Sequence, residues 1–174
     1  FTASEDAGDC HEFCRELERL MGTGPDPVDW RFGIDVKQLV VRGARVAAVA
    51  TSAGEVEADA FVLALGTAAP ELLRPLGIRV PVYPLKGYSL TVRVTHEAGA
   101  PKVSVTDFKR KVVYARLGSE LRVAGMADLA GRRAELDTER VEQLVAEARA
   151  AFPDASDWRD VQPWCGLRPA TPRG

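Results

Sequence analysis

The sequence predicts an α+β fold, in which two amphipathic helices accompany short and mostly antiparallel strands. Apolar residues spaced three or four apart over 10–21 and 138–152 predict the helices. Apolar and polar residues alternate over 88–94, which predicts a half-buried strand. Helix periodicity at both ends and strand alternation between them therefore set the fold class.

Composition excludes several classes of function. The chain has 174 residues and a net charge of −2, which gives no basis for a nucleic-acid partner. Its longest apolar run, 60–65, is far too short to cross a bilayer. Three irregularly spaced cysteines fit a reducing compartment better than a disulfide framework. Cys10, His11 and Cys14 lack a fourth ligand, so half-buried helix cysteines are favoured over a metal site.

The first half of the chain is predicted to hold two helices and several strands. Asp9 takes the N-cap position of the helix at 10–21, and Gly22 ends that helix. Thr67 is the expected N-cap of a short helix at 68–73. The apolar run 60–65 is typical of a parallel strand buried on both faces. Alternation and turn residues predict the other strands at 30–34, 36–41, 45–51 and 55–58.

The second half begins with a proline-bounded strand entry at Val80. Pro81 and Pro84 cannot donate ladder hydrogen bonds, so they precede the paired region or lie on an edge. Gly87 lets another backbone or a flat ligand come close. Asp137 or Thr138 is expected to cap the second long helix. Further strands are expected at 103–106, 112–117, 121–124 and 161–167.

Several stretches, in order, carry a resemblance to a known family. They are Glu5–Cys10, Ala64–Gly66, Val80–Val92, Val123–Met126 and Trp164–Pro172. Together they resemble FAD-dependent D-amino acid dehydrogenases, within the wider D-amino acid oxidase and glycine oxidase family. The resemblance implies part of an FAD-binding lobe at 1–79, a substrate lobe at 80–162 and a return segment at 163–174.

A glycine-rich dinucleotide turn is absent from the sequence. Tight FAD binding relies on a Gly-x-Gly-x-x-Gly loop that exposes a helix N-terminus to the pyrophosphate. The family carries that loop ahead of the stretches matched here, and this chain does not begin with Met. We therefore expect an internal piece of a larger enzyme that binds FAD weakly or not at all alone. Exposed apolar faces on 61–65 would favour its self-association.

Arg168 is the leading candidate for a substrate-binding residue. A guanidinium presents a planar fork of donors that matches a carboxylate. The resemblance assigns the arginine of Gly166-Leu167-Arg168-Pro169 to the carboxylate of an amino acid. The alternative is a surface arginine ahead of a proline turn. Arg173 departs from the family, which usually has Asp at that position, and this puts the local hydrogen bonding in doubt.

The resemblance also suggests other contacts, each with a structural alternative. Tyr88 and Tyr114 could offer hydroxyl groups to a substrate pocket, and both fit equally well as packed sheet residues. Lys86 lies at the crossover between the lobes, where it could face the flavin or an acidic partner. The other expected cofactor contacts are Val36, Ala64 and Gly66, with core packing for Val36 and a simple strand end for Gly66 as alternatives.

The expected function of the parent protein is the oxidation of D-amino acids to 2-oxo acids and ammonium, as part of amino acid catabolism. No catalytic side chain is identified, because a flavin carries this chemistry. Electrons would pass to an acceptor other than oxygen, such as a quinone. The expected location is the cytoplasm or the inner face of the cell membrane. The alternatives are a glycine or sarcosine oxidase, another FAD-dependent amine or hydroxy-acid oxidoreductase, and a non-catalytic folded module.

Overall fold

The computed structural model describes residues 8–172 and divides into two compact units. The first unit contains 84–168 together with the N-terminal residues up to Phe13. The second contains 14–83 together with the C-terminal residues from Pro169. The α+β class predicted from the sequence is confirmed, since each unit combines helices with an antiparallel sheet.

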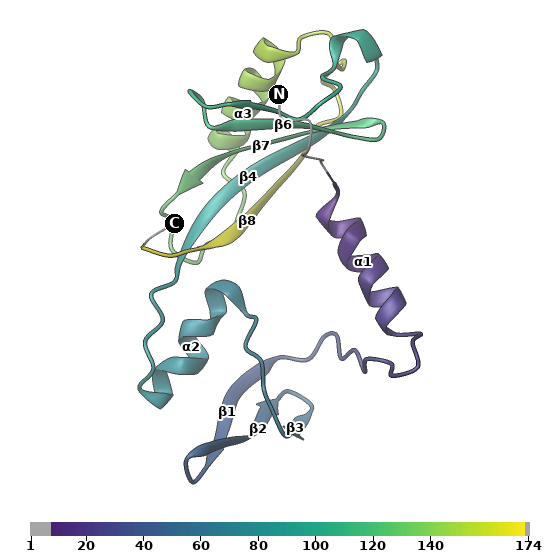
Figure 1. Ribbon diagram of the computed structural model, residues 1–174. Helices are drawn as coiled ribbons and strands as arrows, with labels where there is room; N and C mark the ends of the chain where they lie inside the picture. Colours follow the sequence, from purple (N-terminus) through teal and green to yellow (C-terminus); the bar gives the residue numbers. More distant parts are fainter. Residues whose placement is uncertain (1–7, 173–174) are drawn as a thin grey trace. The chain divides into compact units, whose positions relative to one another are not determined.

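A five-stranded sheet forms the first unit, with strand order β5-β6-β7-β4-β8 (Figure 1). Hydrogen bonding is antiparallel between β4 and β7, between β6 and β7, and between β5 and β6. The long strand β4 lies inside the sheet, and β8 lies beside it at the edge. The strands are β4 Tyr83–Arg93, β5 Val105–Asp107, β6 Val112–Leu117, β7 Glu120–Asp128 and β8 Gln162–Ala170, with a 3₁₀ turn at Glu97–Gly99.

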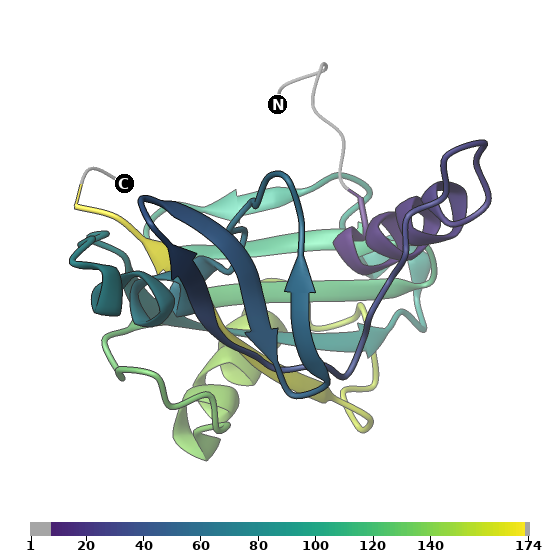
Figure 2. The same cartoon turned by 90° about the horizontal axis from the view of Figure 1, so that it is seen from below.

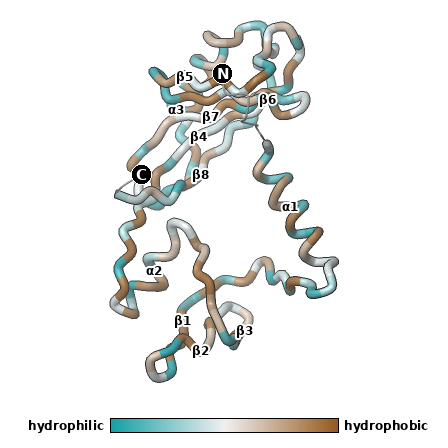
Figure 3. Tube along the Cα trace, viewed as in Figure 1, coloured by the Kyte–Doolittle hydropathy of each residue, from teal (hydrophilic) through white to brown (hydrophobic). Residues whose placement is uncertain are grey.

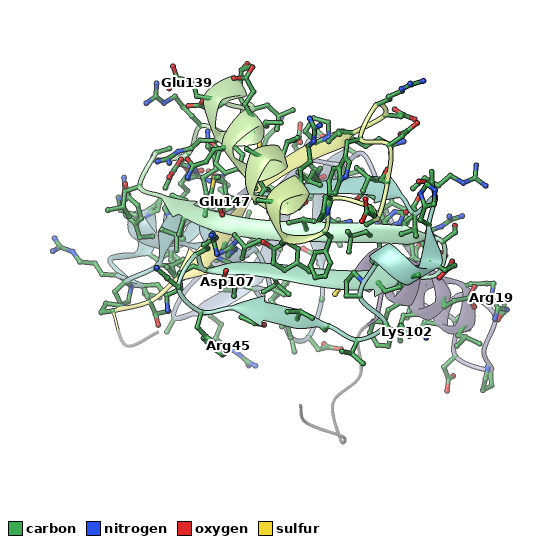
Figure 4. The ribbon with its side chains drawn as sticks, turned by 90° about the horizontal axis from the view of Figure 1, so that it is seen from above. Arg19, Arg45, Lys102, Asp107, Glu139 and Glu147 are labelled. Atoms are coloured by element: carbon green, nitrogen blue, oxygen red, sulfur yellow. The ribbon has the colours of Figure 1, made fainter. Side chains whose placement is uncertain are left out.

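Helix α3, Thr138–Ala151, covers one face of this sheet. Its N-cap is Asp137, whose side chain accepts N–H groups from Glu139 at 3.0 Å and Arg140 at 3.3 Å, as the sequence predicted. Figure 4 looks onto this face and shows Glu147 on the sheet side of the helix and Glu139 directed away. The buried core beneath α3 contains Tyr88, Leu90, Val92, Ala100, Val112, Tyr114, Leu121, Val123, Leu144, Ala148 and Ala155.

The alternation predicted for β4 is confirmed. Tyr88, Leu90 and Val92 are at most 2% exposed and point toward α3. Their neighbours along the strand point to the opposite face, because successive strand residues alternate. Within 84–168, α3 is the only α-helix, and that opposite face is left without a helix of its own. We call it the open face.

The second unit is built on a three-stranded antiparallel meander with strand order β1-β2-β3, seen from below in Figure 2. The two predicted hairpin turns are confirmed, at Gly43 and at 52–53. Ala48 on the middle strand is the one fully buried apolar residue found among 14–83. The elements are β1 Val36–Arg42, β2 Arg45–Thr51, β3 Gly54–Glu57, α2 Ala69–Leu73 and the flanking 3₁₀ turns Gly66–Ala68 and Arg74–Leu76.

Helix α1, Cys10–Met21, begins where the capping pattern predicted. The Asp9 carboxylate accepts the N–H of His11 at 2.8 Å and of Glu12 at 3.4 Å. None of its residues is buried. Apolar and polar segments alternate along the helix in Figure 3. The exposed apolar residues are Phe13, Leu17, Leu20 and Met21.

Three sequence predictions in this half of the chain were wrong. No strand forms at 30–34, where Gly33 adopts a φ of 70° and the rings of Trp30 and Phe32 stack with centroids 5.9 Å apart. No strand forms at 60–65, because no strand among the described residues pairs with it; Val62 is 91% exposed. Thr67 lies inside a 3₁₀ turn and caps no helix.

Candidate functional site

The open face gathers polar and small residues from three adjacent strands. On β4 these are the residues that alternate with Tyr88, Leu90 and Val92, including Thr91, which is half-buried, and Ser89, which is 6% exposed. The register pairs Ser89 with Ala124 and Thr91 with Arg122, so the two β7 residues face the same way. Strand β8 adds residues that contact this group. The open face therefore consists of Gly87, Ser89, Thr91, Arg122, Ala124, Trp164, Gly166 and Arg168.

The guanidinium of Arg168 lies directly over Gly87. A Cβ atom on residue 87 would overlap Cζ, Nε and Nη2 of that guanidinium. The sequence predicted that Gly87 permits a close approach, and the approaching group is this arginine of the neighbouring strand. The missing side chain at position 87 therefore creates the place that Arg168 occupies.

A β-bulge in β7 supplies the hydrogen-bond acceptor for Arg168. Lys86 pairs with Asp128 and Tyr88 pairs with Gly125, so β7 has one extra residue between these two pairs. Met126 in the bulge has a φ of 64°, which is unusual for a residue with a side chain. Its carbonyl oxygen accepts a hydrogen bond from Arg168 Nη2 at 3.4 Å. This long hydrogen bond orients the guanidinium and uses only one of its five donors.

Arg168 has no carboxylate partner among residues 8–172. Other arginines of the same unit are neutralised within the fold. Arg116 binds both carboxylate oxygens of Glu97, and Arg140 binds both oxygens of Asp128. An exposed guanidinium with free donors on a flat sheet is suited to binding a carboxylate from outside the fold.

A second guanidinium without a carboxylate partner lies on the same face. Arg122 donates to Ser89 Oγ at 3.3 Å, and its Cζ lies 6.0 Å from the ring centroid of Trp164. The Trp164 ring in turn lies over Gly166, where a Cβ atom would overlap it. Two glycines thus each make room for one planar group on this face.

Lys86 points to the covered face of the sheet. It is 6% exposed, and its Nζ donates to the Glu135 carbonyl oxygen at 2.9 Å. The nearby Tyr88 hydroxyl raises the pKa of Lys86, although that hydroxyl lies outside hydrogen-bond geometry. Cys165 donates to the adjacent Ala134 carbonyl oxygen at 2.9 Å. Both side chains therefore tie the segment ahead of α3 to the sheet.

Tyr88 and Tyr114 also lie on the covered face. Each is 2% exposed, and both hydroxyl groups are buried without a hydrogen-bond partner among the described residues. Burial is the main cause that raises the pKa of Tyr114, followed by the charge of Glu147. The structure does not bring either hydroxyl to the open face. Their role in a substrate pocket stays a prediction, and our proposal for substrate binding uses Arg168.

The remaining predicted cofactor contacts lie together in the second unit. Val36 is 44% exposed at the start of β1. Ala64 is exposed in the irregular segment ahead of the 3₁₀ turn at Gly66. Gly66 has a φ of 51°, and a Cβ there would meet only the Pro169 ring, at 3.8 Å or more. These positions stay predictions.

Sequence reasoning missed Arg122, Trp164 and the bulge at Met126. The strand alternation could have placed Arg122 beside Arg168, since both fall opposite to buried positions. The bulge had no clear signal, because its left-handed residue is a methionine and not a glycine. Trp164 reaches Arg122 only through pairing of strands far apart in the sequence.

Residues 8–172 form neither a metal site nor a membrane-spanning helix. No group of three or more His, Cys, Asp or Glu side chains is placed to hold a metal ion. No helix there has the length and apolarity needed to cross a membrane. Cys10, Cys14 and Cys165 are free thiols.

Comparison with protein families identifies the class to which this chain belongs. The family model described as DAO, FAD dependent oxidoreductase, matches residues 3–174. The chain therefore belongs to the DAO family of FAD dependent oxidoreductases. Among curated proteins it is similar to D-amino acid dehydrogenase of Paramagnetospirillum magneticum, 45% identical over 172 residues. It is also similar to D-amino acid dehydrogenase 2 of Ralstonia nicotianae, 47% identical over 182 residues.

These comparisons cover nearly all of this chain and a smaller part of each relative. The match takes in 99% of the chain and 40% of the Paramagnetospirillum protein, and 100% and 43% for the Ralstonia protein. The crystal structure of glycine oxidase from Geobacillus kaustophilus matches 81% of the chain and 37% of that structure. Its TM-score is 0.70 at 24% identity, which shows a shared fold.

Proposed function

We propose that the protein containing this chain is an FAD-dependent D-amino acid dehydrogenase in which Arg168 binds the carboxylate of the substrate. The observation that carries this is the exposed Arg168 guanidinium, which lies over Gly87 without a carboxylate partner among the described residues. A bidentate pair would fix the position and orientation of the carboxylate. The D configuration and the dehydrogenase activity are carried over from the names of the relatives.

The part of this chain in the reaction is to position the substrate. A carboxylate held by two parallel N–H groups leaves the rest of the amino acid few orientations, which lowers the entropic cost of reaction. FAD, when bound, would supply the hydride acceptor for oxidation at Cα, and the imino acid formed would hydrolyse in water to a 2-oxo acid and ammonium. The proposed role of Arg168 is binding and orientation, and no proton-transfer role is assigned to any side chain of the open face.

The described residues fit FAD as contact points and not as its main cradle. Gly66 offers backbone without a side chain at a tight turn, and Val36 and Ala64 are exposed in the same unit. No strand, glycine-rich loop and helix occur in succession within 8–172 to receive a pyrophosphate. We therefore propose these three residues as FAD contacts and assign the phosphates to none of them.

Four finer features belong to the same proposal. The electron acceptor is a molecule other than oxygen, such as a quinone, and the reaction serves amino acid catabolism. The location is the cytoplasm or the inner face of the cell membrane, for which three free cysteines are the support. The isolated chain self-associates through exposed apolar residues such as Phe13, Leu20 and Val62. Sedimentation of a monodisperse monomer would contradict this last point.

The test uses the full-length protein and dye reduction with D-alanine and L-alanine as substrates. Replacing Arg168 by Met removes two charge-assisted hydrogen bonds, each worth about 1.5–3 kcal/mol, so kcat/KM for D-alanine falls at least about 100-fold. Arg168→Lys keeps the positive charge but lacks the planar fork of donors, so its kcat/KM for D-alanine falls less than that of Arg168→Met. Arg149→Met, exposed on α3, is the matched control and keeps the wild-type rate.

Two outcomes would overturn the proposal. Absence of dye reduction with every D-amino acid would end the assigned activity. Wild-type KM in Arg168→Met would show that another group holds the carboxylate. Peroxide formation with glycine, without dye-linked turnover of D-alanine, would favour a glycine oxidase.

A further inference from the structure

The open face carries a second anion-binding group beside Arg168. Arg122 has no ion pair with any residue in 8–172; its contacts there are the hydrogen bond to Ser89 Oγ and the ring of Trp164. A guanidinium that stacks on an indole and donates to one neutral hydroxyl keeps its positive charge and most of its donors. Its charge is thus available to a ligand on the open face.

The two guanidinium groups are spaced as the ends of a short diacid. Arg168 lies over Gly87, and Arg122 reaches Ser89, two positions further along β4. Two steps of an antiparallel strand span about 7 Å. The two carboxylate carbons are separated by three C–C bonds in aspartate and four in glutamate, so they lie about 4–5 Å apart when extended, given C–C bonds of about 1.5 Å, and each carboxylate can meet one guanidinium.

The surface between them is low and leaves room for a ligand. The open-face positions there are Gly87, Ser89, Ala124 and Gly166, none of which has a side chain longer than a hydroxymethyl group. Arg122 and Trp164 also line a groove of about 620 Å³, which includes neither these four residues nor Arg168. It is lined also by Thr91, Asp9 and His11.

Asp9 is the carboxylate that could compete for Arg122, and it is committed elsewhere. Its oxygen accepts the first N–H groups of α1, and these hydrogen bonds are the main cause that lowers the pKa of Asp9. The charge of Arg122 contributes less, and the two side chains form no ion pair within 4.0 Å. Asp9 therefore leaves the Arg122 donors free.

We propose that Arg122, held by Trp164 and Ser89, is a second carboxylate subsite that selects amino acids with an acidic side chain. Resting on the proposed function, this makes D-aspartate and D-glutamate the favoured substrate class: Arg168 binds the α-carboxylate and Arg122 binds the distal one. Trp164 keeps the Arg122 guanidinium flat and shields one side of it from water, which strengthens its pairing with an anion.

The first experiment measures substrate preference in the full-length enzyme. Arg122→Gln removes the charge and keeps a hydrogen-bond donor for Ser89. We expect kcat/KM for D-glutamate and D-aspartate to fall about 30-fold or more, because the distal carboxylate of the substrate loses the guanidinium that would pair with it. The value for D-alanine stays within about 3-fold, since no distal carboxylate is present. Trp164→Leu gives a smaller loss, confined to the acidic substrates.

A control variant separates a local effect from a general change in charge. Arg93→Gln removes an exposed positive charge at the end of the same strand β4. We expect it to leave the ratio of D-glutamate to D-alanine activity unchanged. An equal loss for all substrates in Arg122→Gln, or the same ratio as in the wild type, would overturn the proposal.

The second experiment reads binding without turnover. Calorimetry of the full-length protein compares succinate with butyrate, which has the same chain length and one carboxylate. We expect succinate to bind more tightly to the wild type and the difference to vanish in Arg122→Gln. If no D-amino acid is oxidised but this difference is present, the dehydrogenase proposal fails and the subsite stands. If succinate binds no better than butyrate, the subsite is wrong even in an active enzyme.

Discussion

On the face of the five-stranded sheet covered by α3, Tyr88, Leu90 and Leu121 are at most 2% exposed. On the open face of the same strands, Trp164 is 58% exposed and Arg168 is exposed as well. One face holds aliphatic and aromatic side chains, and the other holds two guanidinium groups over small residues. Because strand residues alternate, the residues that stabilise the core and those proposed to bind a ligand occupy interleaved positions of the same strands. Substitutions on the two faces should therefore have separable effects.

The largest expected effect is on the covered face. Leu121→Ala empties space at a residue that is fully buried, so the free energy of unfolding falls by about 2–5 kcal/mol. KM for D-alanine in the folded variant stays within about 3-fold of the wild type. Urea unfolding of the full-length protein and steady-state kinetics at low temperature measure the two quantities.

A control for this change lies on the opposite side of the neighbouring strand. Val113 pairs with Ala124 and is 37% exposed, so Val113→Ala should cost less than about 1 kcal/mol. If both variants lost the same stability, the two faces would not differ as described. A large rise in KM for Leu121→Ala would show that core packing and substrate binding are coupled.

On the open face we expect the reverse, namely a small change in the free energy of unfolding and a large change in kcat/KM. In Gly87→Ala the new Cβ would overlap the Arg168 guanidinium, which is the free end of a flexible side chain and can move aside. Unfolding free energy should change by less than about 1 kcal/mol. Displacing Arg168, the proposed carboxylate-binding group, should lower kcat/KM for D-alanine by about 10–100-fold.

A double-mutant cycle tests whether Gly87→Ala acts through Arg168. If it does, Gly87→Ala causes no additional loss in an enzyme that already carries Arg168→Met. Fully additive losses would show that position 87 contributes independently, for example through the backbone of β4. Kinetics of the four enzymes with D-alanine decide between these results.

Local patterns predicted most of the first unit from the sequence. The caps at Asp9 and Asp137 and the buried series on β4 were correct because each depends on neighbouring residues. The same alternation places Lys86 and Tyr88 with Leu90 on the covered face, a consequence that the family resemblance obscured. Periodicity was the better guide to which way these side chains point.

What the sequence could not predict depends on non-local pairing. The contact of Trp164 with Arg122 and the position of Arg168 over Gly87 arise from the alignment of β8, β4 and β7. The run 60–65 shows the opposite error, since an apolar segment forms a strand only when another strand pairs with it. The apolar composition of a segment indicates that it can be buried, but it does not specify which strand, if any, pairs with it.

The smallest expected effect sharpens the comparison most, because it concerns a residue for which a substrate-pocket role and packing within the sheet were both open alternatives. Tyr114 has a buried hydroxyl without a hydrogen-bond partner among the described residues, while its ring packs edge-on against Phe152 at 5.1 Å. Tyr114→Phe keeps the ring and removes the unpaired hydroxyl. The free energy of unfolding should stay constant or rise by up to about 1 kcal/mol.

Two results would contradict this description of Tyr114: the first would contradict its unpaired hydroxyl, and the second its absence from the substrate pocket. A loss of more than about 1 kcal/mol would indicate a hydrogen bond through a buried water, with Glu147 Oε2 as the second partner, because that oxygen is also buried and unpaired among the described residues. A rise in KM for D-alanine without loss of stability would return Tyr114 to the substrate pocket. One outcome changes the free energy of unfolding and the other changes KM. Urea unfolding and steady-state kinetics must therefore both be measured on Tyr114→Phe.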